Sequence, residues 1–253
     1  LMGDVFARAG EENLAWQKYL ENKKIFDQFR HDLSPAYIQL IARRLLDNGE
    51  REAAVDLCRS FIIQRQKDKR VTDVDRAGVQ LILGDCYFRE QRFDIARSEY
   101  NTCVNLYAAT PQAVTARFKV GECFMAQKMY DKAEEVFADL AKSKDEDTVI
   151  RAMLMQGFLY HAQGKRTETV EQFKKVLAMN PRNEVADELF YRMGLVYQES
   201  GKLREAYNLF RLVGSGGRET KRYVAPGTQL LFRLSDKDLN ITRGEAKVPI
   251  LVE

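Results

Sequence analysis

Hydrophobic positions recur along the first 213 residues with the three-to-four-residue spacing of amphipathic helices, and short polar turns separate these segments. Ser34-Pro35 marks one helix start, because a hydroxyl side chain at the N-cap and a proline in the first turn both favour it. An earlier apolar helix is predicted over residues 11–29. The pattern then predicts helix pairs at 35–64, 75–107, 112–142, 147–179 and 184–213.

A small residue followed three positions later by an aromatic residue or leucine marks the first helix of each pair. The copies are Gly3/Phe6, Ala42/Leu45, Gly84/Tyr87, Gly121/Phe124, Gly157/Tyr160 and Gly194/Tyr197. The intervals range from 36 residues (121 to 157) to 42 residues (42 to 84). An internal period of this length indicates a stacked helical array rather than a fold with one central core.

Three further positions recur in phase with these glycines. Small residues, among them Ala96, Ala133 and Ala206, follow twelve positions later, and we expect them with the glycines where the two helices of a pair cross. Aromatic residues follow sixteen positions later and are expected to fill the volume between neighbouring pairs. A second glycine seven positions after the first, as at Gly164, is expected to end the first helix in a left-handed conformation.

At these positions the chain resembles the tetratricopeptide repeat family, over about residues 1–213. The segment from Gly157 through Tyr160, Gly164 and Phe173 to Pro181 matches best, although the family's tryptophan four residues before the glycine is missing. The resemblance implies an all-α fold, a right-handed α-solenoid of helix pairs. It also implies that the first helices line a concave groove, with contact positions three before, one after and four after the glycine.

The groove positions carry apolar and aromatic side chains edged by a few charges. In the third to sixth copies they are Leu81, Asp85, Phe88, Phe118, Glu122, Met125, Leu154, Phe158, His161, Tyr191, Leu195 and Gln198. We interpret them as a surface for a partner helix or extended peptide. The alternative is that several of these side chains pack inside the array.

One subfamily of these repeats holds the carboxylate of a chaperone tail with lysine, asparagine and arginine at set positions. The corresponding positions here are Leu81, Asp85, Lys119, Arg151 and Met155. A charged clamp of that kind is therefore not expected.

The helical pattern ends at Val213. Residues 214–222 are expected to form a flexible linker and residues 223–253 a β-like tail, either the start of a β-sandwich domain or a segment that folds back. The first copy begins inside its first helix, so we expect a piece of a larger, bacterial multidomain protein. The compartment stays open.

Composition gives little support to catalysis or nucleic-acid binding. The net charge is only +3, and the first helices lack a basic stripe. His31 and His161 are about three repeats apart, so a shared metal site or acid–base pair is not expected, and neither is a cofactor. No apolar run approaches the ~20 residues of a membrane span.

Two local features have simple interpretations. Arg65, Lys67, Lys69 and Arg70 are expected at a solvated helix end, and the four cysteines are expected to be small buried side chains rather than disulfides. The leading hypothesis is a non-catalytic scaffold that binds a protein or peptide partner. The alternatives are a spacer or assembly module that self-associates through exposed repeat ends, and a protein whose catalytic domain lies elsewhere.

Overall fold

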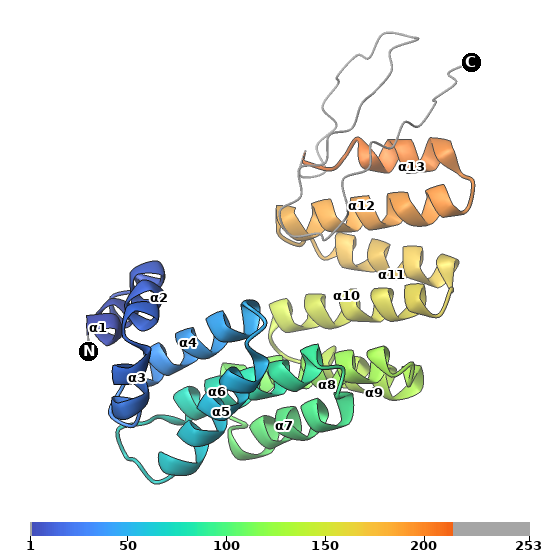
Figure 1. Ribbon diagram of the computed structural model, residues 1–253. Helices are drawn as coiled ribbons and strands as arrows, with labels where there is room; N and C mark the ends of the chain where they lie inside the picture. Colours follow the sequence, from blue (N-terminus) through green and yellow to red (C-terminus); the bar gives the residue numbers. More distant parts are fainter. Residues whose placement is uncertain (1, 215–253) are drawn as a thin grey trace.

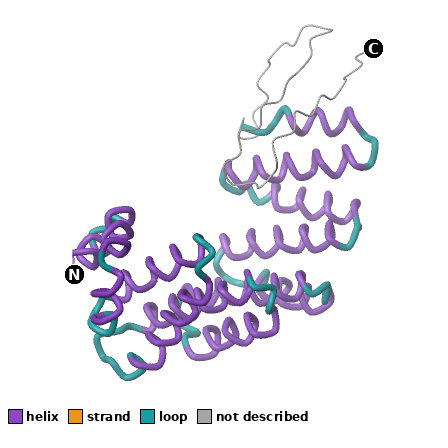
Figure 2. The backbone as a smooth tube through the Cα atoms, viewed as in Figure 1, coloured by secondary structure: helices purple, strands orange, loops and turns teal. Residues whose placement is uncertain are grey.

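The computed structural model describes residues 2–214, which form thirteen α-helices in this part of the chain (Figure 1). Figure 2 shows the helices joined by short loops and stacked in chain order. The helices are α1 (Met2–Arg8), α2 (Glu12–Glu21), α3 (Lys23–Phe29), α4 (Pro35–Asp47), α5 (Arg51–Gln64), α6 (Asp73–Arg89), α7 (Phe93–Leu106), α8 (Pro111–Ala126), α9 (Tyr130–Leu140), α10 (Glu146–Ala162), α11 (Arg166–Ala178), α12 (Asn183–Glu199) and α13 (Leu203–Phe210). The predicted all-α array of helix pairs is confirmed. Apart from Gly214, the predicted linker and β-like tail lie outside the described residues.

Side-chain caps start the first helices of the pairs. Ser34 is the N-cap of α4, as predicted, and its hydroxyl accepts a hydrogen bond of 3.3 Å from a backbone N–H of the first turn. Thr72 and Asp75 form a reciprocal capping box at the start of α6. Thr110 and Asp145 cap α8 and α10 in the same way as Ser34. These caps fix where four of the repeats begin, whereas α12 starts after Arg182 without a side-chain cap.

The turn between the helices of a pair uses one left-handed residue. The predicted glycines adopt it with φ between 73° and 83°, at Gly10, Gly49, Gly164 and Gly201. In the third and fourth copies, Gln91 and Lys128 stand at the same place with φ 59°. A side chain in this conformation costs about 1–2 kcal/mol, so these two turns are held by their surroundings.

Each signature glycine makes room for an aromatic ring of its own pair. A Cβ added at the glycine would overlap a ring sixteen residues later, in the pairs Gly84–Tyr100, Gly121–Phe137, Gly157–Phe173 and Gly194–Phe210. The rings therefore pack against the glycine of their own pair, and Phe137 and Phe173 also belong to buried clusters that include side chains of the next pair. Gly3 differs, because its neighbour is Tyr37 of the next pair.

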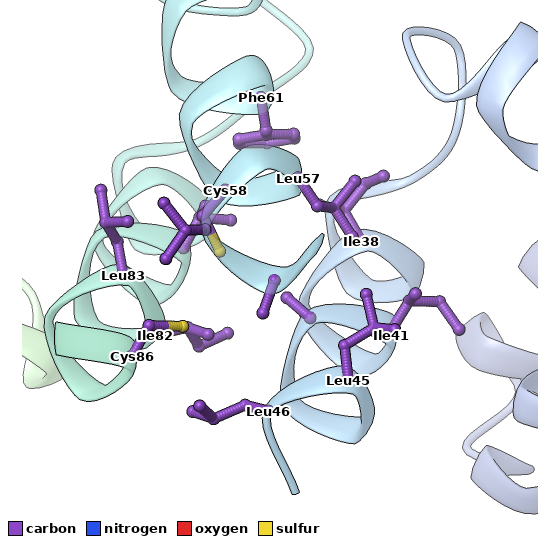
Figure 3. Packing of buried hydrophobic residues seen from close by; sticks show 14 of the residues in the cluster. Ile38, Ile41, Leu45, Leu46, Leu57, Cys58, Phe61, Ile82, Leu83 and Cys86 are labelled. Atoms are coloured by element: carbon purple, nitrogen blue, oxygen red, sulfur yellow. The ribbon is translucent and has the colours of Figure 1, made fainter. Parts of the chain in front are cut away.

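Buried side chains form three clusters rather than one core. The largest reaches from α2 to α8, and Figure 3 shows part of it, where α4, α5 and α6 meet through Ile41, Leu57 and Leu83. A second cluster joins α8, α9 and α10, and a third joins α10 to α13. All four cysteines are buried and free, as predicted. Stability in such an array is approximately a sum over neighbouring repeats.

The first helices lie closer together than the second helices over most of the array. α4 packs on α6 and α6 on α8, whereas the described second helices show no comparable packing on one another. The array therefore curves toward its first helices. At α10 this changes, because α10 packs on α9 and α11 rather than side by side with α8.

Two local predictions need correction. The helix expected over 11–29 is divided at Asn22, whose side-chain Nδ2 donates to the Lys18 carbonyl at 3.1 Å and so ends α2. Arg65 is buried rather than solvated. It donates to the Leu33 carbonyl at 2.5 Å and to Asp68 at 2.9 Å, which anchors the loop between α5 and α6.

Candidate partner-binding face

The predicted groove residues lie on the first helices α6, α8, α10 and α12, and we call the surface they form the inner face. Within each helix they are three, four or seven positions apart, which places them on one side. Most are half-buried, so part of each side chain is accessible: Leu81, Phe88, Met125, Leu154, Phe158, Tyr191 and Leu195. Asp85 and Glu122 are also half-buried, and His161 and Gln198 are exposed.

Phe118 is not accessible in this structure. Its side chain is 1% exposed and stacks on Phe137 with 6.5 Å between ring centroids. The Arg151 guanidinium of α10 lies over its other side, 4.1 Å from the ring centroid. The position assigned to Phe118 in the predicted groove is therefore occupied at the surface by Arg151. For Phe118 the alternative therefore holds: its side chain packs inside the array.

Cations over aromatic rings connect neighbouring first helices along the inner face. Lys119 of α8 lies 5.7 Å from the centroid of Phe88 on α6, and Arg192 of α12 lies 5.1 Å from that of Phe158 on α10. Both cations also have a carboxylate on their own helix, Glu122 at 2.8 Å from Lys119 and Glu188 at 2.6 Å from Arg192. The inner face is thus less purely apolar than the sequence indicated.

Asp85 is held by a hydrogen bond from the second helix of its pair. The Tyr100 hydroxyl donates to its carboxylate at 2.6 Å. Burial raises the pKa of the Asp85 carboxyl, while the Tyr100 hydrogen bond and Lys119 act in the opposite direction. Burial, with the nearby carboxylate, also raises the pKa of Tyr100. Asp85 is therefore fixed in the wall of the inner face and does not project as a mobile charge.

Arg151 differs from the other cations of the inner face. Within residues 2–214 no carboxylate lies within ion-pair distance of its guanidinium, and no protein group accepts a hydrogen bond from it. Burial lowers the pKa of the guanidinium, and Glu122 on α8 opposes this shift. The sequence prediction considered Arg151 only as part of a clamp. Its position three residues before Leu154, on the same side of α10, was the signal that it belongs to the groove.

The described residues contain no cluster of three or more metal-ligating side chains, and none of their helices has the length and apolar content to cross a membrane. An open depression lined by Lys128, Tyr130 and Lys165 lies at the turns between paired helices, away from the inner face. Burial raises the pKa of Cys86 and of Cys123 to about 12, which makes these thiols poor nucleophiles.

Family comparison identifies the repeats. Two tetratricopeptide repeat models match the chain, at residues 104–147 and 151–183. The chain contains tetratricopeptide repeats. No match was found among curated protein sequences.

Solved structures share the fold of this chain at low sequence identity. A tetratricopeptide repeat protein from Parabacteroides merdae has a TM-score of 0.61 and 16% identity, with 86% of this chain and 77% of that chain covered. BtubC from P. vanneervenii has a TM-score of 0.54 and 17% identity, with 93% and 98% covered. The Rap conjugation gene regulator of plasmid pLS20 has a TM-score of 0.56 and 13% identity, with 70% and 52% covered.

Tetratricopeptide repeat proteins bind protein partners, and their repeats typically act as non-catalytic scaffolds. The array described above therefore has the architecture of a protein-interaction scaffold.

Proposed function

We propose that the inner face of this tetratricopeptide repeat array binds a helix or extended peptide of a partner protein. The observation that carries the proposal is the row of half-buried apolar side chains on successive first helices, from Phe88 on α6 through Met125, Leu154 and Phe158 to Tyr191 on α12. Side chains of this kind serve as anchors when a partner covers them. One structure of the same fold, the Rap regulator of pLS20, was solved in complex with a peptide.

The apolar residues alone support only weak binding. Completely burying one such side chain contributes about 1.5–3 kcal/mol, and a half-buried one retains about half of that to gain. The seven half-buried apolar side chains of the inner face would contribute roughly 5–10 kcal/mol in total. Association costs at least about 4 kcal/mol in lost freedom of motion. We therefore expect polar contacts to contribute to any binding tighter than roughly 10 μM.

The test uses peptides selected from a random display library on the wild-type protein. Their affinity is then measured for Phe88→Ala/Phe158→Ala and for the control Leu106→Ala, which removes a 65% exposed side chain at the end of α7. We expect the double variant to bind at least tenfold more weakly and the control to bind within twofold of wild type. Equal affinity of all three proteins would reject the inner face as the binding site.

A second proposal, self-association, rests on a different surface. Met2 and Val5 on α1 are 62% and 51% exposed. The equivalent residues of the third copy, Leu83 and Cys86, are 3% and 0% exposed because the preceding pair covers them. A second copy of the chain could cover α1 in the same manner. Light scattering tests this: a dimer that Val5→Lys dissociates supports it, and a monomer at high concentration rejects it.

A further inference from the structure

Among residues 2–214, Arg151 is the cation of the inner face that has no carboxylate partner. Arg89 donates to Asp47 at 2.7 Å and to the Leu46 carbonyl at 3.0 Å, and Lys119 and Arg192 have the carboxylates described above. Arg151 has an aromatic ring on one side and no acceptor among residues 2–214. A guanidinium carries five N–H donors in a planar fork that matches a carboxylate.

The position of Arg151 makes it suitable for recognition rather than for simple solvation. It is half-buried, so part of its hydration is already lost, and the Phe118 ring at 4.1 Å holds the guanidinium plane in place. It also lies on α10, which packs on α9 and α11 and not side by side with α8, so the guanidinium reaches Phe118 from a helix that is not tightly packed on that of the ring. A donor group that is fixed in advance loses little freedom when a ligand binds.

We propose that the partner segment carries an aspartate or glutamate side chain that binds Arg151, next to apolar residues that cover Leu154 and Phe158. This inference rests on the proposed function of the inner face. Arg151, Leu154 and Phe158 lie on one side of α10, and at about 1.5 Å per residue they are separated by roughly 4.5 Å and 10 Å along its axis. A helical partner would match this with an acidic residue followed or preceded by apolar residues three and seven positions away.

The unpaired charge supports an acidic partner over a neutral or basic one. A basic side chain placed here would meet an uncompensated, half-buried cation, since Glu122 is already bound to Lys119 at 2.8 Å. A neutral amide could accept one hydrogen bond but would not match the fork or the charge. Charge complementarity therefore favours a carboxylate.

The experiment selects 16-residue peptides with blocked C-termini from a random display library on four proteins. They are the wild type, Arg151→Met, Phe88→Ala/Phe158→Ala, and the control Arg117→Met. Arg117 lies on α8 and is ion-paired with Asp139. Arg117→Met therefore removes one positive charge, as Arg151→Met does, but a charge that already has a partner in the protein. We expect acidic residues to be enriched at one position in the wild-type and Arg117→Met pools and to lose that enrichment on Arg151→Met.

A selected acidic peptide and its amide version, with Glu→Gln or Asp→Asn, then give a double-mutant cycle. We expect the acidic peptide to lose at least tenfold in affinity on Arg151→Met and the amide peptide to bind wild type and Arg151→Met equally. Equal losses for both peptides would show that Arg151 acts only through its contact with the Phe118 ring, and would overturn the inference. So would a wild-type pool that needs Phe88 and Phe158 but shows no acidic preference. If no pool depends on Phe88 and Phe158, the proposed function itself fails.

Discussion

The ring of Phe173 lies so close to Gly157 that a Cβ at position 157 would overlap it. Gly157→Ala would normally favour a helix, since alanine is the better helix former by about 1 kcal/mol. Here the overlap with Phe173 makes the alanine destabilising, and we expect the free energy of unfolding to fall by about 1–3 kcal/mol. Urea unfolding followed by circular dichroism measures it. Phe173→Leu should relieve the overlap, so the double variant is expected to be more stable than the sum of the single changes implies.

The left-handed turns give a stabilising substitution. Gln91 has φ 59° at a position where four other repeats have glycine. Gln91→Gly removes the steric cost of this conformation, and we expect the free energy of unfolding to rise by about 1 kcal/mol. Gly164→Ala, the reverse change at φ 74°, is expected to lower it by a similar amount. A less stable Gln91→Gly protein would show that other contacts of this turn dominate.

The Tyr100–Asp85 hydrogen bond links the two helices of the third pair. Tyr100→Phe leaves the Asp85 carboxylate without its donor, and we expect a loss of about 1.5–3 kcal/mol at pH 7, as for hydrogen bonds to charged groups. In an Asp85→Asn background the same change should cost less, because the acceptor is neutral. Chemical denaturation of the four proteins gives the coupling energy, and additive effects would contradict a direct interaction.

Asp85 and Asp68 should affect the pH dependence of stability with opposite signs. Burial raises the pKa of Asp85 in the folded protein above its value in the unfolded chain. The contribution of Asp85 to stability is therefore greatest below the unfolded-state pKa and falls as pH rises through the folded-state pKa. Hydrogen bonds from Arg70, then Arg65, lower the pKa of Asp68, so its contribution is present above the unfolded pKa and lost as pH falls.

Between pH 3 and pH 7, Asp85→Asn should therefore gain stability relative to wild type while Asp68→Asn loses it. Unfolding curves at several pH values measure both differences. Parallel changes for the two variants would contradict these assignments.

The repeat phase could be predicted from the sequence because small residues and caps are local signals. The bounds of the five complete pairs agree with the structure within three residues, and the turn glycines were assigned correctly. Phe118 could not be placed in the same way. Whether a first-helix aromatic faces outward depends on how closely the next first helix approaches, which is a property of the curvature. Arg151 could have been placed from its spacing of three residues to Leu154, but its lack of a carboxylate partner within residues 2–214 depends on the neighbouring helices and is visible only in the structure.

The central claim is that partners bind the inner face, and photo-crosslinking tests it most directly. A display-selected peptide carrying a benzophenone group is irradiated with the protein, and the adducts are located by mass spectrometry. We predict adducts in α6, α8, α10 and α12, reduced by unlabelled peptide and lost in Phe88→Ala/Phe158→Ala. Adducts that unlabelled peptide reduces but that lie only on the second helices, such as α7, α9 and α11, would contradict the account.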